Sequence, residues 1–184
     1  DGDYQIINAE RDGGRWMTMH LLDLGHKTVF YVGRVQGATD NTRANGWKDA
    51  LEERGIEAPE PIVVSDGNLE KAVKAGHELG RRGEATAIFA DSDETAIAVI
   101  RGLRETGRRV PDDVSVVGFD DRNFGALWEP SLTSYTQNFL DMGERSFRML
   151  FEQIQAKRMG ADMPPSQIEV VQGQPCLRAS EREI

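Results

Sequence analysis

The sequence is poor in the residues that make covalent and metal cross-links. It contains one cysteine, Cys176, and three histidines among 184 residues. A single cysteine cannot form a disulfide within the chain, which fits a reducing compartment. One cysteine and three scattered histidines also do not provide the ligand cluster that a metal site needs. We therefore expect neither a metal nor a cofactor.

Positive charge is also in deficit. The chain has 22 basic and 31 acidic residues, which gives a net charge of −9. A surface that binds phosphates needs an excess of positive charge, so the composition argues against DNA binding by this chain itself. No apolar run approaches the length of a transmembrane helix, and no signal peptide is visible after Asp1. We expect a cytoplasmic protein without a membrane partner.

Alternating strand and helix patterns are what the chain does contain. Hydrophobic content is 39% and charged content 29%, ordinary values for one or two small folded domains. Segment 12–14, Asp-Gly-Gly, predicts a turn before the first helix. Strands that alternate with helices of this length indicate an α/β fold with a mostly parallel sheet. The expected strands are 4–8, 28–32, 61–65, 85–90, 114–117, 132–136 and 167–171, and the expected helices are 15–24, 42–54, 69–81, 94–106 and 140–157, with a helical turn at 124–128.

The strand expected at 114–117 is the most informative stretch. It is short, apolar and β-branched, a pattern typical of a strand buried on both faces. Gly118 lets the chain turn at its end, and Asp120 and Asp121 follow. Open α/β sheets bind ligands at the carboxyl ends of their strands, so Asp120 is a candidate ligand contact. Equally, Asp120 would serve as a helix cap with Asp121 facing water.

Segment 109–121 also carries a resemblance to a known family. It reads Arg-Val-Pro-Asp-Asp-Val-Ser-Val-Val-Gly-Phe-Asp-Asp, which resembles the effector-domain signature of lactose-repressor-type (LacI/GalR) bacterial transcription regulators. Segments 86–93, 130–137, 24–26 and 43–47 fit the same family pattern. The resemblance covers residues from about 12 to about 173.

This resemblance implies a type I periplasmic-binding-protein-like fold, in which two α/β lobes with parallel sheets are joined by three crossovers. One lobe, comprising 27–136 and 164–184, would be nearly complete. The other, comprising 1–26 and 138–163, would be partial, and its apolar surfaces would need another chain to cover them. The family's DNA-binding headpiece is expected to lie outside this chain.

Two residues match the family's effector contacts most directly. Arg43 occupies the position of the arginine in Arg-x-x-Gly-Trp, and its planar guanidinium suits a pair of hydroxyls or a carboxylate. Without the family pattern, an arginine near a helix N-terminus would be read as a solvated surface charge. Asp120 matches the effector-binding aspartate, whose two oxygens suit a pair of sugar hydroxyls.

Two further positions depart from the family pattern. Asp91 and Ser92 stand where the family usually has Ala-Asn, so the hydrogen-bonding groups offered to a ligand change, which favours a ligand with more donors, such as an amine. Ser92 also suits a helix N-cap, and both roles are compatible. Asp66 falls where the family often has an aspartate followed by an aromatic ring. Here Gly67 follows, so that stacking surface is missing unless Trp16, Trp47, Trp128 or Phe139 replaces it.

Two residues after the strand at 132–136 complete the candidate set. By family position, Gln137 is a candidate hydrogen-bond donor and Phe139 a candidate wall of the effector site. Core packing is the alternative for Phe139, because it is the commoner fate of a phenylalanine. For Trp47 we favour packing between helices.

These patterns predict a ligand-sensing domain of a transcription regulator, not an enzyme. Carboxylate pairs exist, but no positioned nucleophile or general base accompanies them, so no catalytic residue is predicted. The resemblance implies a small-molecule effector, either a sugar or a similar molecule, operator DNA bound through the headpiece, and a homodimer. The alternative is a periplasmic-type solute-binding protein for sugar uptake, which shares the fold and which the signature at 109–121 disfavours.

Overall fold

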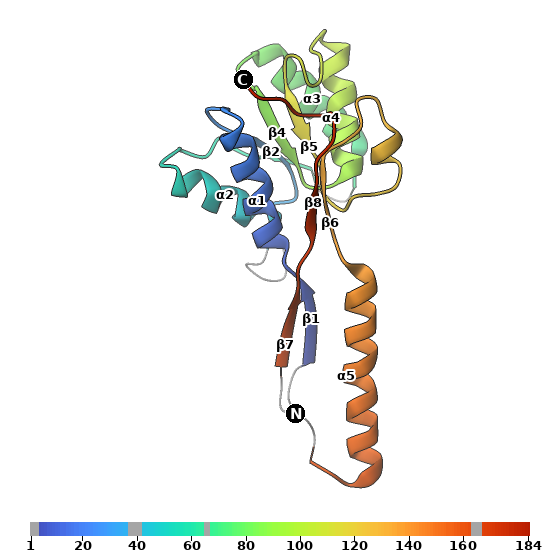
Figure 1. The fold of residues 1–184 in the computed structure, drawn as a ribbon. Coiled ribbons are helices and arrows are strands. Elements are labelled where there is room, and N and C mark those ends of the chain that lie inside the picture. Colours follow the sequence, from blue (N-terminus) through green and yellow to red (C-terminus); the bar gives the residue numbers. More distant parts are fainter. Residues whose placement is uncertain (1–3, 37–41, 65–66, 163–166) are drawn as a thin grey trace. The chain divides into compact units, whose positions relative to one another are not determined.

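The computed structural model describes residues 4–36, 42–64, 67–162 and 167–184 (Figure 1). The chain divides into two compact units. The large unit comprises residues 10–136 and 174–184, and the small unit comprises 1–9 and 137–173. Asp66, one of the candidate site residues, lies outside the described residues.

The large unit is built on a parallel sheet with the strand order β3-β2-β4-β5. All four strands were expected from the sequence. The register places Val32 opposite Ile62 and Ala90, and Ile88 opposite Val116. Every residue of the central strands is buried, as their apolar runs predict. The bounds are Phe30–Gly33 for β2, Ile62–Val63 for β3, Ala87–Ala90 for β4 and Ser115–Val117 for β5.

A short antiparallel ribbon follows β5. Strand β6 (Ser134–Thr136) pairs with β8 (Gln174–Cys176), and a parallel bridge joins Val117 to Thr133. Strand β8 was not expected from the sequence, because a three-residue strand with a proline at its centre gives no period-2 signal. Beyond β8, the carbonyl of Ser180 accepts from Val116 N at 2.8 Å, so the end of the chain lies beside β5, the strand that precedes Asp120.

Two helix pairs cover the two faces of this sheet (Figure 1). Successive strand residues point to opposite faces, so Val32, Ile88 and Val116 pack toward α3 and α4. Tyr31 and Phe89 pack toward α1 and α2. The confirmed architecture is therefore a parallel α/β layer structure, with α1 at Glu10–Asp23, α2 at Arg43–Glu53, α3 at Leu69–Arg82, α4 at Asp93–Glu105 and a 3-10 turn at Gly125–Leu127.

A row of aromatic rings forms the centre of the core on the α1–α2 side. Trp47 lies 5.3 Å from Tyr31, and Tyr31 lies 5.5 Å from Phe89, measured between ring centroids. Phe119 lies 6.3 Å from Phe89 and 5.1 Å from Tyr135. Trp47 is fully buried and its Nε1 donates to the carbonyl of Val29 at 2.8 Å. These contacts confirm the packing role expected for Trp47.

The first helix begins earlier than the sequence suggested. Gly13 and Gly14 are not a turn before α1 but buried residues within it. A Cβ on Gly14 would stand 2.4 Å from the carbonyl oxygen of Arg43, and a Cβ on Gly46 would stand 1.9 Å from that of Arg11. The glycines therefore let α1 and α2 pack with their backbones in close approach, a tertiary requirement that outweighs glycine's low helix propensity.

The small unit consists of two parallel strands and one long helix. Strand β1 (Tyr4–Asn8) pairs with β7 (Gln167–Val171), and both have the bounds expected from the sequence. Helix α5 (Phe139–Met159) contacts β1. Only Met149 of α5 is buried. Its exposed large apolar residues are Phe139, Leu140, Phe147, Leu150, Phe151, Ile154 and Met159.

The unit boundaries differ from the lobes expected from the sequence. Residues 10–26 belong to the large unit because α1 packs on α2, and 164–173 join the small unit because β7 pairs with β1. The last residues are held in place, since Ser180 is fully buried and Ile184 N donates to the carbonyl of Leu24 at 3.0 Å. None of the helices in the described part of the chain has the length and apolar character of a membrane span.

Candidate functional site

A pocket of about 330 Å³ lies in the large unit at the carboxyl ends of the parallel strands. This is the edge at which open α/β sheets bind ligands. Residues that follow β2, β4 and β5 meet there with the first residue of α2. Four of the predicted site residues, Arg43, Asp91, Ser92 and Asp120, line the pocket together with Arg34, Val64, Gly67 and Thr95.

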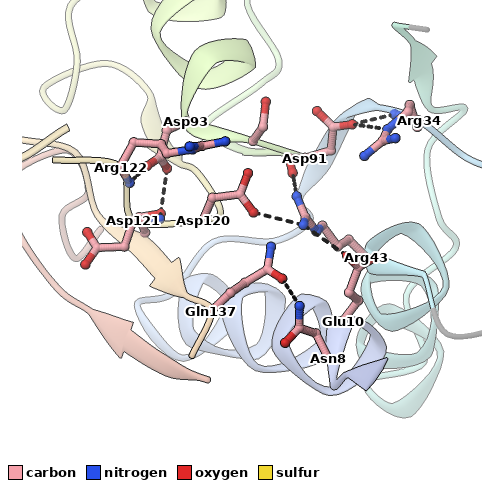
Figure 2. Close-up of polar contacts among 12 residues, drawn as sticks. Asn8, Glu10, Arg34, Arg43, Asp91, Asp93, Asp120, Asp121, Arg122 and Gln137 are labelled. Carbon is pink, nitrogen blue, oxygen red and sulfur yellow. Dashed lines mark hydrogen bonds and ion pairs between the residues drawn. The ribbon is translucent and has the colours of Figure 1, made fainter. Parts of the chain in front are cut away.

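Arg43 is a buried and rigidly held cation, with 7% of its surface exposed. Its Nη2 donates to Asp120 Oδ1 at 2.9 Å and to Glu10 Oε1 at 3.1 Å, and its Nη1 donates to the carbonyl of Asp91 (Figure 2). The guanidinium lies 4.0 Å from the centroid of the Phe119 ring, a cation–π contact. Arg43 is therefore no solvated surface charge; it organises three acceptors around one pocket wall.

Asp120 does not cap a helix. Its backbone has φ of 98°, a left-handed conformation that residues with side chains rarely adopt. Its amide donates to the carbonyl of Tyr135 at 2.9 Å, and its carboxylate accepts from Arg43. Asp121 does not simply face water either, because it accepts from Arg178 Nη2 at 2.6 Å. The turn after β5 thus aims one carboxylate at Arg43 and ties the next to the C-terminal segment.

Asp91 is engaged by the neighbouring strand. Its Oδ2 accepts from the backbone amide of Arg34 at 2.9 Å and lies 3.6 Å from Arg34 Nε. Gly33 permits this approach, since a Cβ there would stand 2.3 Å from the Asp91 side chain. One oxygen of the carboxylate is therefore engaged by Arg34, and the amine ligand stays a prediction.

Ser92 caps α4 and lines the pocket at the same time. Its hydroxyl accepts from Thr95 N at 3.2 Å and donates to Thr95 Oγ1 at 2.9 Å. Both expectations for Ser92 are thus compatible with the structure. Thr95 is largely buried and lines the same pocket wall.

Gln137 and Phe139 belong to the small unit and are not among the residues that line the pocket. Gln137 Oε1 accepts from Asn8 Nδ2 (Figure 2). This hydrogen bond connects the segment just before α5 to the last residue of β1. Phe139 is the first residue of α5 and is 54% exposed, so it is not a core residue. Their predicted contact with an effector stays a prediction.

Sequence reasoning missed Arg34, Glu10 and Thr95. Arg34 follows the buried strand β2 directly, as Asp91 follows β4, so the rule that polar residues after parallel strands line the ligand edge would have found it. Glu10 had no such signal, because its role depends on the packing of α1 against α2. Among the described residues, no group of three His, Cys, Asp or Glu residues is placed to hold a metal ion.

Comparisons with known proteins give the same family as the signature at 109–121. A model of the periplasmic binding protein-like domain matches residues 18–180. The transcriptional regulator CelR of Thermobifida fusca is 37% identical over 145 residues, which is 77% of this chain and 43% of the relative. The ribose operon repressor of Halalkalibacterium halodurans is 32% identical, over 83% of this chain and 46% of the relative. The chain therefore spans about half the length of these curated relatives.

Solved structures agree with the sequence relatives. The structure described as a CelR–cellobiose complex superposes with a TM-score of 0.84 at 31% identity, over 97% of this chain and 54% of the other. A LacI family regulator from Enterococcus faecium, solved with bound ribose, superposes with a TM-score of 0.83 at 27% identity, over 98% of this chain and 66% of the other. The chain thus belongs to the periplasmic binding protein-like domain family and, within it, to the effector-binding domains of LacI/GalR-type transcription regulators.

Proposed function

We propose that the pocket of the large unit binds a small polyol effector, such as a sugar, and that this binding controls a DNA-binding regulator of which the chain is a part. The observation that carries the proposal is the pairing of buried Arg43 with Asp120 at the ligand edge of the sheet. Guanidinium donors beside carboxylate acceptors match adjacent sugar hydroxyls, each of which donates and accepts a hydrogen bond.

The relatives support regulation over transport or catalysis. The matched proteins of known function are transcription regulators, and two structural relatives carry the sugars cellobiose and ribose. A ligand controls such a protein only if it binds one conformational state more tightly than another, and that difference in affinity is the coupling free energy. We infer that the protein is not an enzyme and that it acts in the cytoplasm, where its operator DNA is found.

We also infer that the protein is a homodimer, through the groove between α3 and α4. This groove, of about 690 Å³, is lined by apolar Val73, Ile97 and Trp128. Glu70, Glu94, Arg101 and Arg104 border it, so the surface carries both signs of charge and can pair with a second copy of itself. Leu127, which precedes Trp128 in the sequence, is 88% exposed. So large an exposed fraction next to an apolar groove is typical of a leucine that is covered by a partner chain.

The experiment that tests effector binding is a thermal-shift screen of the protein against sugars, sugar phosphates, polyols, amino sugars and purines. A ligand that binds only the folded state must raise the melting temperature. For any ligand that raises it, Arg43→Lys and Asp120→Asn should remove most of the shift. Each variant's shift is measured from its own ligand-free melting temperature, because both substitutions also disturb a buried ion pair.

Two matched variants serve as controls. Arg54→Lys and Asp112→Asn change the same residue types in exposed surface pairs away from the pocket. They should keep the full ligand-induced shift. A ligand whose shift survives both pocket substitutions would show that the effector binds elsewhere. A protein that melts cooperatively and responds to none of these compounds would contradict the proposed ligand class.

A further inference from the structure

Asp93 is a fully buried carboxylate that the pocket itself does not use. It is the first residue of α4, directly after the cap Ser92, and none of its surface is exposed. Its amide donates to the carbonyl of Phe119 at 2.9 Å. Gly118 lets the end of β5 come close, since a Cβ at Gly118 would stand 2.4 Å from Asp93 Oδ1. Asp93 therefore lies against the turn that carries Asp120, but it is not among the residues that line the pocket.

The carboxylate of Asp93 supports two successive backbone amides of that turn, one directly and one through the hydroxyl of Ser134. Its Oδ2 accepts from the backbone N of Arg122 at 2.5 Å (Figure 2). Its Oδ1 accepts from the Ser134 hydroxyl at 2.5 Å, and the oxygen of that hydroxyl accepts from Asp121 N at 3.0 Å. Ser134 thus extends the reach of Asp93 by one residue along the turn.

The turn has a backbone conformation that needs such support. Asp120 has φ of 98° and Asp121 has φ of 50°, so two successive non-glycine residues are left-handed. Conformations of this kind persist only where the surrounding contacts hold them, and they cluster at ligand sites. Asp93 provides its contacts on the carboxyl side of Asp120, at the amides of Asp121 and Arg122.

We propose that Asp93 is a positioning residue of the effector site: by holding the amides of Asp121 and Arg122, it fixes the left-handed turn that aims Asp120 at Arg43. Asp93 makes no contact with the effector in this arrangement. The proposal rests on the proposed effector site and identifies what sets its geometry.

The same burial makes this support sensitive to pH. Burial raises the pKa of Asp93, the hydrogen bonds from Ser134 and Arg122 oppose this effect, and the negative charges of Asp120 and Asp121 add to it, so that the resulting pKa is about 6. As the pH falls from 7.5 to 5, Asp93 becomes neutral. Hydrogen bonds to a neutral carboxyl are weaker than those to a carboxylate, so the turn should loosen.

Other charged or titratable groups near Asp93 and the turn come from three parts of the chain. On α4, Oε1 of Glu94, the residue after Asp93, lies 3.8 Å from Arg122 Nε. From the C-terminal segment, Arg178 binds Asp121. Cys176 on β8 has its pKa raised, chiefly by burial and with smaller contributions from Asp121 and Asp93. A titration of the turn must therefore be assigned by substitution of Asp93 itself.

The test is NMR of the ¹⁵N-labelled chain between pH 7.5 and 5, without any ligand. In the wild-type protein, the amide signal of Arg122 should shift with a midpoint near pH 6. In Asp93→Asn this titration should disappear. A titration that persists in Asp93→Asn would overturn the pH-dependent part of the proposal, because another group would then be responsible.

Amide exchange and the Arg43 side chain report the positioning itself. In Asp93→Ala, the amides of Asp121 and Arg122 should exchange at least about tenfold faster, and the Nε–H signal of Arg43 should shift. Asp93→Asn retains one acceptor and should give a smaller effect. If the two amides keep wild-type exchange, or if they change while Arg43 does not, the proposal is wrong. Should Asp93→Ala not fold, Asp93→Asn and Ser134→Ala carry the same test.

The matched control is Asp113→Asn. Asp113 also accepts a backbone amide, that of Arg109 at 2.8 Å, in an exposed turn. Its substitution should leave the signals of Asp121, Arg122 and Arg43 unchanged. Because no ligand is added, these results stand apart from the effector screen: a protein that binds none of the screened compounds can still show the turn held by Asp93.

Discussion

At the scale of single residues, burial decides what each ionisable group contributes. Arg43 is buried against carboxylate and carbonyl acceptors, whereas His26 is buried beside two hydroxyls: its Nδ1 lies 3.0 Å from Thr86 Oγ1 and its Nε2 3.1 Å from Ser115 Oγ. Either ring nitrogen can be the donor. Burial lowers the pKa of His26 below its ordinary value of 6.5. This histidine stabilises the fold in its neutral form.

A loss of stability on acidification follows from this lowered pKa. As the pH falls below about 6.5, the unfolded chain binds a proton at His26 before the folded protein does. The contribution of neutral His26 to the free energy of unfolding therefore decreases on acidification, by at most about 1.4 kcal/mol for each pH unit. Urea unfolding at pH 7.5 and 5.5 should show a smaller loss in His26→Gln than in the wild type. Equal losses would contradict the prediction. The raised pKa of Asp93 acts in the opposite direction, so only the difference between the two proteins isolates His26.

The residue scale also shows how far the sequence predicts the site. Asp91, Ser92 and Asp120 are brought to one pocket because each closely follows a strand at the carboxyl edge of the sheet, a position that strand boundaries reveal, whereas Arg43, the first residue of α2, was predicted only from the family pattern. The commitment of Asp91 to the Arg34 amide was not predictable, because it depends on the close approach of β2 and β4 at Gly33.

At the scale of elements, helix pairs are joined through glycine. The α1–α2 contact depends on Gly14 and Gly46, and the α3–α4 contact depends on Gly76 and Gly102, where an added Cβ would stand 2.3 and 2.1 Å from a backbone carbonyl oxygen of the facing helix. Glycine inside a helix is ordinarily unfavourable, so local propensity predicted a turn at Gly13 and Gly14. Strand bounds were easier to predict, as β1 and β7 show, because alternation and β-branched composition are local signals.

Two glycine substitutions should therefore have opposite effects. Gly46→Ala forces α1 and α2 apart and should lower the free energy of unfolding by about 1–3 kcal/mol. Gly143→Ala, in α5, meets nothing within 4 Å and should raise local helix stability by about 0.5–1 kcal/mol. Urea unfolding monitored by circular dichroism measures both. A neutral or stabilising Gly46→Ala would show that the close approach of these helices is not needed.

At the scale of the whole molecule, the two units differ in how much they bury. The large unit has apolar cores on both faces of its sheet. In the small unit, α5 buries Met149 alone, and β7 exposes Ile168 and Val170. In proteins most of the stability of a helix comes from tertiary packing of its apolar face, and α5 has little such packing.

Local stability should therefore differ between the units. We expect backbone amides of α5 to exchange with solvent at least about tenfold faster than those of α4, because α5 opens without the large unit unfolding. Hydrogen exchange followed by mass spectrometry gives this comparison within one sample. Equal protection of α4 and α5 would mean that the exposed apolar side of α5 is covered in solution.

Dimerisation can be tested at the groove between α3 and α4. Leu127→Glu places a charge on the apolar surface beside Trp128 and should shift the protein from dimer toward monomer, since a charge is costly to bury at a self-paired surface. Light scattering coupled to size-exclusion chromatography measures the mass. Leu69→Glu, also at this groove, should act in the same direction. A dimer that is unchanged by both groove substitutions would exclude this surface.

The aromatic row of the core gives the protein an optical property. Trp47 lies 5.3 Å from Tyr31, and the hydroxyl of Tyr31 donates to the carbonyl of Arg34, a residue of the pocket wall. Light absorbed by Tyr31 will pass to Trp47 by resonance transfer over so short a separation. Once Trp16 and Trp128 are replaced by phenylalanine, the remaining indole emission comes from Trp47, which is fully buried and lies against the tilted ring of Tyr31. Its wavelength and intensity then form a built-in, label-free signal for rearrangements that start at Arg34.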